Sequence, residues 1–378
     1  MQTSTNDLII HIRKEIEANN GSISFDRFME LALYHSEQGY YCSENFMLGK
    51  EGDFITAPHI SPLFAQCVAH QAIQVFPHLQ QKNILELGAG LGQFACDFLN
   101  ELNQQQSLPS HYYIYEISHR LRKKQQNLLQ TKCPALYSRC IWLEKLPENF
   151  SGLVIANEVL DAFPVHTFRV ENNSIKERCV AYEKDEFVWK LREPTSLLAE
   201  KAEAIRKQYH LENGYESEIN LRLPTFMEEL GRGFTQGLIL FIDYGYGEEE
   251  YYHPERSHGS LTCFYQHKHH ANPLICPGLQ DITAHVNFTA LIENAAANNF
   301  ELAGFTTQAG FLFSLGLMDF VYAAEQQLSE TDKFALHQAV KQLTMPTEMG
   351  ERIKVMALSK GLDLDLPAFS LQDRRRDL

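Results

Sequence analysis

Apolar residues at helical spacing characterise the first part of the chain. Leu8, Ile12 and Ile16 recur every four residues and predict one face of a helix. Ser24 is a residue type that caps helix N-termini, and the apolar residues behind it predict a second helix. Together these elements predict a helical N-terminal cap over residues 1–80, which also carries a loop on the substrate side.

Beyond Pro77 the pattern changes to short apolar runs that alternate with longer helix-like segments. Such alternation is typical of a parallel β-sheet covered by helices on both faces, so an α/β domain is predicted for residues 81–378. The predicted strands are Asn83–Leu87, Tyr112–Tyr115, Leu153–Ala156 and Leu238–Ile242, followed near the C-terminus by Glu301–Gln308 and Arg352–Ser359.

Residues 171–237 interrupt this alternation. They contain two short alternating runs and a charged, helix-like piece at 197–208, which is more than a simple connection between strands needs. We therefore expect 171–237 to be an insertion into the sheet domain. A polar and aromatic stretch at 244–285 follows the fourth predicted strand, and we expect its loops on the substrate side.

Composition and charge restrict the partners. The chain has 378 residues, of which 44% are hydrophobic, so it can bury a substantial core. Its formal net charge of −15 repels phosphate backbones, and a nucleic-acid partner is not expected. No segment approaches the roughly 18 consecutive apolar residues of a membrane span, so no span is expected either.

Cysteine and histidine patterns bear on metals and on the compartment. The eight cysteines form no CxxC pair, so neither a zinc site nor a dense disulfide framework is predicted. The histidines form no HExxH motif, and no metal is expected. Scattered thiols suit a reducing compartment and the N-terminal residues show no apolar signal segment, so a cytoplasmic location is predicted.

The strongest chemical signal is the turn Gly88-Ala89-Gly90-Leu91-Gly92, which lies between a predicted strand and a predicted helix. Glycines let the backbone turn tightly and approach a ligand, and nucleotides bind at the carboxyl edge of such sheets. A dinucleotide fingerprint would place its third glycine at position 93, which is Gln93. The spacing therefore favours a different nucleotide.

Two acids flank this turn. Glu86 lies two residues before Gly88, where it would repel a pyrophosphate and attract an ammonium or sulfonium group. Glu116 lies 24 residues beyond Gly92, where an acid accepts hydrogen bonds from a ribose diol. This arrangement resembles class I S-adenosylmethionine methyltransferases. The resemblance implies S-adenosyl-L-methionine as the cofactor, with Glu86 near its methionine end and Glu116 on its ribose.

Three polar residues, Asn157, Glu158 and Asp161, follow the third predicted strand. In the class I layout this edge faces the transferable methyl group. Glu158 and Asp161 are three residues apart and would share a face if a helical turn begins there. A carboxylate pair suits a guanidinium group, whose planar N–H fork matches carboxylate oxygens. The alternative is that the acids only stabilise a helix N-terminus.

Five motifs in order extend the resemblance to roughly residues 22–361. They are Gly-Asp-Phe-Ile-Thr-Ala-Pro (52–58), Glu-Leu-Gly-Ala-Gly-Leu-Gly (86–92), Asn-Glu-Val-Leu-Asp-Ala-Phe-Pro (157–164), Asp-Tyr-Gly (243–245) and Gln-Asp-Ile-Thr-Ala-His-Val (280–286). Together they resemble the MidA-like family, whose members include a mitochondrial arginine methyltransferase needed for assembly of respiratory complex I. The resemblance implies a Rossmann-like class I methyltransferase sheet.

The same resemblance implies methylation of an accessible arginine in a protein substrate, such as a subunit of respiratory complex I. The expected catalytic residues are Asp53, Asn157, Glu158 and Asp161. The expected cofactor-binding residues are Thr56, Pro58, Glu86, Gly88, Gly90, Gly92 and Glu116, and the expected substrate-binding residues are Phe54, Tyr244 and His285. A homodimer is a further expectation.

Two other functions remain open. The chain could be an assembly factor that binds S-adenosylmethionine and acts mainly by holding its partner, or it could methylate a small molecule. A substitution at Glu158 that abolishes methylation but leaves partner binding intact would separate the first alternative from the enzyme.

Overall fold

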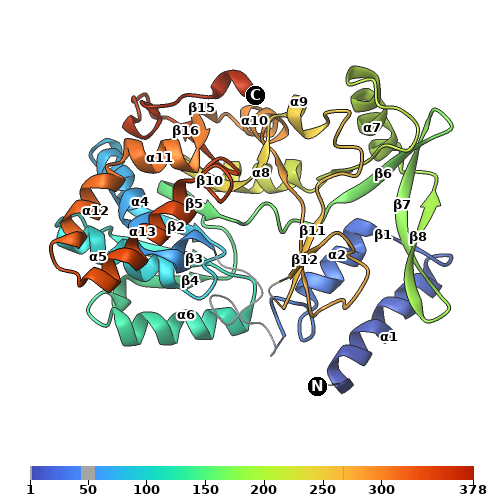
Figure 1. Cartoon of the computed structure of the whole chain (residues 1–378), viewed down its shortest axis with the longest axis horizontal. Helices are drawn as coiled ribbons and strands as arrows, with labels where there is room; N and C mark the ends of the chain where they lie inside the picture. Colours follow the sequence, from blue (N-terminus) through green and yellow to red (C-terminus); the bar gives the residue numbers. More distant parts are fainter. Residues whose placement is uncertain (1, 44–55, 267) are drawn as a thin grey trace. The chain divides into compact units, whose positions relative to one another are not determined.

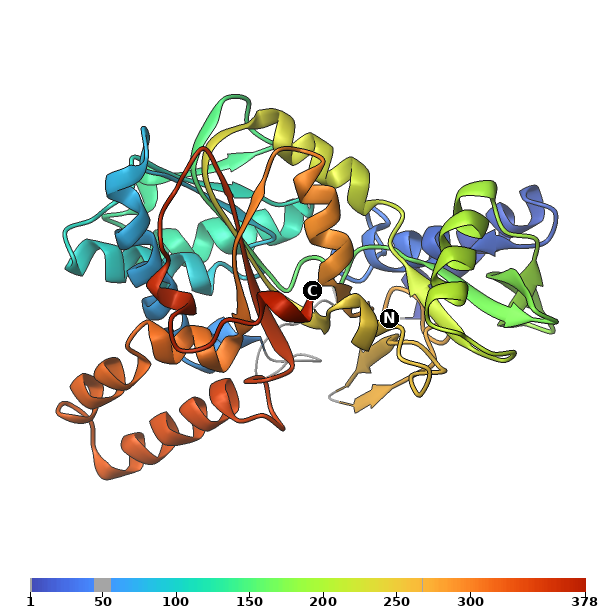
Figure 2. The ribbon, with the colours of Figure 1, turned by 90° about the horizontal axis from the view of Figure 1, so that it is seen from above.

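The computed structural model describes residues 2–43, 56–266 and 268–378, which form two compact units (Figures 1 and 2). The sheet unit comprises Ile55–Leu160, Thr225–Gly245 and Phe288–Leu378. The second unit comprises Met1–Phe54, Asp161–Pro224 and Tyr246–Asn287. The boundary expected near residue 80 therefore falls inside the sheet unit.

A single large sheet organises the sheet unit, and its main path runs β15-β16-β10-β5-β2-β3-β4 (Figure 1). Neighbouring strands from β10 to β4 are parallel, as the alternation of apolar runs predicts. The strands are β2 (Asn83–Leu87), β3 (His111–Tyr115), β4 (Cys140–Leu143), β5 (Phe150–Asn157), β10 (Phe234–Tyr246), β15 (Glu301–Thr307) and β16 (Ile353–Lys360).

The sheet is mixed, and in this it departs from the purely parallel sheet expected from sequence. β16 pairs antiparallel with both β10 and β15. A strand that is parallel to its neighbour needs a crossover connection back to the same end of the sheet, whereas an antiparallel strand does not. β16, the last strand of the chain, can therefore run in the opposite direction between β10 and β15. The short strand β4 was also missed, because it is only four residues long. The expected Rossmann-like α/β fold is otherwise confirmed.

Helices cover both faces of this sheet, as predicted. Leu240 and Ile242 of β10 point into the main core, together with Phe64 and Phe98 from two helices. Side chains alternate along a strand, so Phe241 points to the other face, where its ring meets Phe226. The helices of this unit are α3 (Ala57–Ile60), α4 (Pro62–Val75), α5 (Gln93–Gln104), α6 (His119–Lys132), α8 (Leu223–Gly233), α10 (Phe288–Ala296), α11 (Gln308–Ser314), α12 (Leu317–Glu325) and α13 (Glu330–Thr344).

Local sequence signals set the ends of several helices. Ser61 caps α4 by accepting the N–H of Leu63, and Pro62 occupies the first helical position, where its missing N–H costs nothing. Near the C-terminus α12 and α13 lie side by side (Figure 2), and His337 of α13 pairs with Glu325 of α12. This helical region lies between β15 and β16 in sequence, as expected.

The second unit is built around a five-stranded antiparallel sheet, in which β1-β7-β6-β9 is the main path and β8 pairs with β7. A smaller sheet runs β12-β11-β13. The elements are α1 (Gln2–Ala18), β1 (Ile23–Ser24), α2 (Phe25–Tyr34), β6 (His166–Glu171), β7 (Ser174–Glu183), β8 (Glu186–Arg192), α7 (Ser196–Gln208), β9 (Glu216–Ile219), α9 (Glu248–Tyr251), β11 (Thr262–Tyr265), β12 (Lys268–His270), β13 (Asp281–Thr283) and β14 (Val286–Asn287).

The N-terminal helices belong to this second unit through a two-residue strand. Ile23 pairs with Val180 of β7, and Ser24 then caps α2 by accepting the N–H of Arg27. The N-terminal region and the expected insertion thus share one sheet. None of the helices in the described part of the chain is long and apolar enough to cross a bilayer.

Candidate functional site

The glycine turn links β2 to α5 in the sheet unit. Gly88, Gly90 and Gly92 have φ angles of 64°, 53° and 86°, in the left-handed region that favours glycine. Gly92 is also the N-cap of α5. The turn thus has the backbone form that the sequence predicts, with no side chain at three of its five positions.

Glu86 is a buried carboxyl at the end of β2. The hydroxyl of Tyr112 donates a hydrogen bond to Glu86 Oε2 at 2.8 Å. Burial raises the pKa of Glu86 to about 8, the charge of Glu116 adds to this rise, and the Tyr112 hydrogen bond opposes it. A cation placed beside Glu86 would favour its ionised form.

Glu116 follows β3 and is 4% exposed. Its Oε1 accepts the backbone N–H of Ser118 at 2.9 Å, and its Oε2 accepts a hydrogen bond from Gln125 Nε2 at 3.0 Å. Burial raises the pKa of Glu116, while these two donors act in the opposite direction. The same Gln125 amide donates to the carbonyl of Gly90 at 2.9 Å, so the glycine turn and the acid share one donor.

β5 ends at Asn157, and the loop that follows begins with Glu158 and approaches the glycine turn. A Cβ built on Gly88 would lie 3.2 Å from Val159 Cγ2. Leu87 of β2 is paired with Ala156 of β5, so both loops leave the same edge of the sheet. Asn157 Nδ2 donates to Glu158 Oε1 at 3.2 Å, whereas the buried Asn157 Oδ1 has no hydrogen-bond partner among the described residues.

The helical turn expected to align Glu158 with Asp161 does not form. Glu158 has a φ angle of 51°, which lies outside the right-handed helical region. The N–H groups of Val159 and Leu160 are both taken by Asp243 Oδ2, at 3.1 and 2.9 Å. No helical turn therefore begins at Glu158, so the condition under which Glu158 and Asp161 would share a face is not met.

Asp243 is a buried acid that holds this loop and that the site prediction did not include. It is 1% exposed at the end of β10, and besides the two N–H groups on Oδ2 its Oδ1 accepts the N–H of Tyr244 at 2.8 Å. The Asp-Tyr-Gly motif at 243–245 was noticed in the sequence, but its acid was given no role. A buried acid directly after a strand of the sheet was the available signal.

The remaining predicted residues are distributed over both units. In the sheet unit Thr56 precedes α3 and its hydroxyl is 2.8 Å from His59 Nδ1, while Pro58 is buried within α3. Tyr244 packs against the main core. Asp53 and Phe54 lie outside the described residues.

Asp161 and His285 belong to the second unit, where the structure brings their backbones close together. The carbonyl of Asp161 accepts the N–H of Ala284 at 2.9 Å. The N–H of His285 donates to Ser260 Oγ, and its imidazole ring meets the ring of Tyr246 edge-on at 5.1 Å between centroids. Asp161 is 7% exposed, so its carboxyl is buried within this unit.

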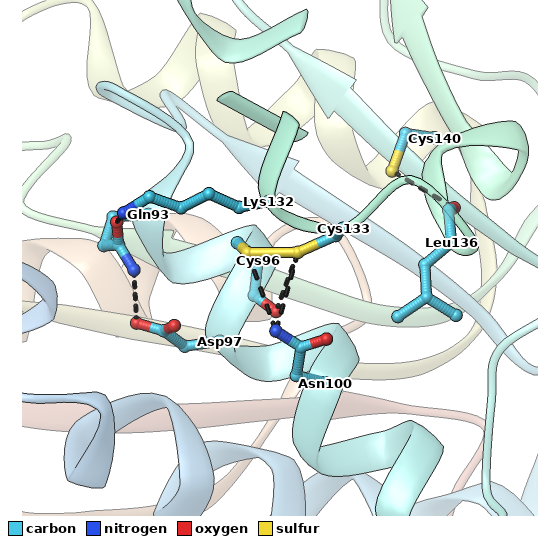
Figure 3. Close-up of a disulfide and its surroundings, with 8 residues drawn as sticks. All are labelled: Gln93, Cys96, Asp97, Asn100, Lys132, Cys133, Leu136 and Cys140. Atoms are coloured by element: carbon cyan, nitrogen blue, oxygen red, sulfur yellow. Dashed lines mark hydrogen bonds between the residues drawn. A yellow bond between two sulfur atoms is a disulfide. The ribbon is translucent and has the colours of Figure 1, made fainter. Parts of the chain in front are cut away.

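A disulfide joins the two helices that follow the glycine turn and Glu116 (Figure 3). It connects Cys96 of α5 with Cys133, the residue after α6. Asn100 Nδ2 donates to both sulfur atoms. The sequence did not predict this bond, because a sequence separation of 37 between the cysteines matches no recognisable spacing.

The residues of the sheet unit fit S-adenosyl-L-methionine. Three left-handed glycines leave the turn open to close approach, and two buried acids offer acceptors suited to a cation and to a ribose diol. The loop of Asn157 and Glu158 supplies further polar groups beside the turn. Among the described residues, no group of three or more histidine, cysteine or acidic side chains could hold a metal ion.

Comparisons with known proteins agree with this fit. Residues 67–306 match the family described as "Putative S-adenosyl-L-methionine-dependent methyltransferase". A solved structure of a likely methyltransferase from Burkholderia thailandensis, bound to S-adenosyl-homocysteine, is 36% identical, with a TM-score of 0.94, and covers 99% of this chain and 97% of its own.

Curated relatives share most of their length with the chain. The protein arginine methyltransferase NDUFAF7 of Danio rerio mitochondria is 28% identical, over 93% of this chain and 86% of its own. The human protein of the same name is 27% identical, over 93% and 83%. The family match, these relatives and the ligand of the Burkholderia structure agree on one cofactor and one class of enzyme. The chain belongs to the MidA-like family of S-adenosyl-L-methionine-dependent methyltransferases.

Proposed function

We propose that this methyltransferase acts on an arginine side chain of a protein, and that Glu158 binds the guanidinium group. The observation that carries the proposal is the position of Glu158, on a loop whose next residue, Val159, contacts the glycine turn at Gly88. The names of the curated relatives support the same acceptor. The family resemblance extends the proposal to a subunit of respiratory complex I as the substrate. A cytoplasmic location is proposed separately, from the scattered cysteines of the sequence.

The cofactor is assigned to the edge of the sheet formed by β2 and β3. The glycine turn would lie against it, Glu86 would face its charged methionine end and Glu116 would accept hydrogen bonds from its ribose. When bound, S-adenosylmethionine supplies an electrophilic methyl group on a sulfonium. Thr56 and Pro58 complete the proposed cofactor-binding set.

Glu158 has two tasks in this proposal. Arginine is protonated at neutral pH, so its acceptor nitrogen becomes nucleophilic only when positive charge is drawn to the other nitrogens. A carboxylate that pairs with those nitrogens does this and also orients the acceptor, and orientation contributes much to the rate of a displacement. Asn157, which donates to Glu158 Oε1, would hold the carboxylate in place.

The other expected residues keep their roles as proposals. Asp53 and Asp161 are proposed as catalytic residues, and Phe54, Tyr244 and His285 as substrate-binding residues. The acidic chain, with a formal charge of −15, favours a basic peptide as the substrate segment.

The experiment that tests the proposal uses purified protein with radiolabelled S-adenosylmethionine and a lysate from a strain that lacks the gene, with methylarginine read by mass spectrometry. Glu158→Gln should lower methyl transfer at least a hundredfold while S-adenosylhomocysteine still binds. Glu348→Gln, at an exposed acid, is the matched control and should be fully active. Methylation of a residue other than arginine, or full activity of Glu158→Gln, would overturn the proposal.

The assembly-factor alternative gives a different result in the same experiment. A protein that acts only by holding its partner would bind S-adenosylhomocysteine and transfer no methyl group in any lysate. Capture of the partner by both wild type and Glu158→Gln, without methylation by either, would favour that alternative.

A further inference from the structure

One buried amide connects the glycine turn to the acid after β3. Gln125 of α6 is fully buried, and its Nε2 lies 2.9 Å from the carbonyl oxygen of Gly90 and 3.0 Å from Glu116 Oε2. An amide nitrogen carries two hydrogens, so it can donate to both acceptors at once. The Gly90 carbonyl and the Glu116 carboxylate, which flank the proposed ribose position, thus share Gln125 as a hydrogen-bond donor.

The orientation of this amide is determined by Trp142 of β4. The indole Nε1 lies 2.9 Å from Gln125 Oε1. An indole N–H only donates, so the oxygen of the amide must face it and the nitrogen must face Gly90 and Glu116. A flipped amide would leave the indole N–H without its acceptor, and the Gly90 carbonyl and Glu116 Oε2 without this donor, at a cost for each group.

Close packing holds Gln125 against the turn. A Cβ on Gly92 would lie 3.2 Å from Gln125 Cα and 3.4 Å from its Cβ and Cγ. The missing side chain at Gly92 therefore lets α6 approach the turn. Two helical turns further along, Cys133 ties the end of α6 to α5 through the disulfide with Cys96.

We propose that Gln125 is a positioning residue for cofactor binding: it holds the Gly90 carbonyl and the Glu116 carboxylate in the arrangement that receives the ribose of S-adenosylmethionine. The inference rests on the proposed placement of the cofactor along the glycine turn and Glu116. Gln125 acts through these two groups. Its donor also stabilises the ionised carboxylate, the form with most acceptor sites for a diol.

The test measures binding of S-adenosylhomocysteine by titration calorimetry to wild type and to Gln125→Met, which keeps the length of the side chain and removes the amide. The variant should bind about tenfold more weakly. Gln308→Met is the matched control. Gln308 is equally buried in the same unit, but its amide donates to Leu343, so this variant should bind within about twofold of wild type.

An analogue of S-adenosylhomocysteine without the 2′ and 3′ hydroxyls separates positioning from general support of the fold. Wild type should lose affinity when the hydroxyls are removed, by about tenfold or more. The affinity ratio of the two ligands should be at least threefold smaller in Gln125→Met than in wild type, because Glu116 is no longer held for the diol. In a Trp189→Phe background, the emission of Trp142 should also shift, since its indole has lost its acceptor.

Several outcomes would overturn the inference. One is that Gln125→Met binds S-adenosylhomocysteine as tightly as wild type does. Another is that the substitution weakens binding of S-adenosylhomocysteine and of the analogue without hydroxyls by the same factor, which would indicate that Gln125 only supports the fold. If Gln125→Met does not fold, Gln125→Asn, which keeps the amide but is too short to reach both acceptors, takes its place with the same expectations. If wild type does not bind S-adenosylhomocysteine, the cofactor placement fails instead, and the inference fails with it.

Discussion

Asp243 Oδ2 accepts the backbone N–H of Leu160 at 2.9 Å, across 83 residues of sequence. The same oxygen accepts the N–H of Val159. The two bonds fix the backbone just after Glu158, which itself adopts a left-handed conformation at a cost of about 1–3 kcal/mol for a non-glycine residue. A buried acid on one strand thus determines the backbone of the neighbouring loop.

Asp243→Asn should therefore disturb this loop. An asparagine has one oxygen and one NH₂ group, so either Tyr244 or the Val159 and Leu160 pair would lose its acceptor. We expect a loss of about 1–3 kcal/mol in the free energy of unfolding, measured by urea denaturation, together with slower methyl transfer. Asp363→Asn, at an exposed acid, is the control, and equal stability of the two variants would contradict this role of Asp243.

Gly90→Val should abolish cofactor binding. Gly90 has a φ angle of 53°, which is unfavourable for a β-branched residue, and the added side chain would enter the space assigned to the ligand. Calorimetry with S-adenosylhomocysteine should show no binding. Gly214→Val controls for backbone strain alone, because Gly214 has a φ angle of 93° and no heavy atom within 4 Å of a built Cβ. Normal affinity of Gly90→Val would contradict the cofactor placement.

The stability of the cofactor-free protein should depend on the ionisation of Glu86. Burial raises the pKa of Glu86 from 4.5 to about 8, so between these values the folded state holds a proton that the unfolded state releases. The contribution of Glu86 is thus complete below pH 4.5 and is lost as the pH rises to about 8, by at most about 1.4 kcal/mol per pH unit.

This dependence is measured by denaturation of wild type and Glu86→Gln at several pH values. The wild type should lose stability relative to the variant across that range, and the difference should level off above it. Parallel curves for the two proteins would show that Glu86 does not carry the raised pKa.

The disulfide between Cys96 and Cys133 should stabilise the sheet unit by restricting the unfolded chain. For a sequence separation of 37, loop-closure entropy gives about 3–4 kcal/mol. Dithiothreitol, or Cys96→Ala with Cys133→Ala, should lower the free energy of unfolding by up to this amount. Cys140→Ala, at a buried free thiol, should leave the sensitivity to dithiothreitol intact. If dithiothreitol has no effect on wild type, the cysteines are not joined in solution.

Local pattern was enough to predict the parallel strands, the glycine turn and the cap at Ser24. Each depends on residues that are close together in sequence. The strands follow from the spacing of apolar residues, the turn from the backbone freedom of glycine, and the cap from a serine side chain that binds a backbone N–H in the first turn of its own helix. The two acids flanking the turn could also be found, because their distance from Gly88 and Gly92 follows from the length of one strand–helix unit. The sequence alone thus determined the fold class, the glycine turn and the cofactor.

Other features depended on side chains that only the tertiary structure brings together. The backbone of the loop after Glu158 is fixed by Asp243, which is distant in sequence. The sharing of Gln125 between Gly90 and Glu116 requires α6 to pack on the turn, and the antiparallel entry of β16 requires both of its neighbours. Hydrogen bonds and pairings between distant segments leave no periodic trace in the sequence, so they were decided by the packed structure.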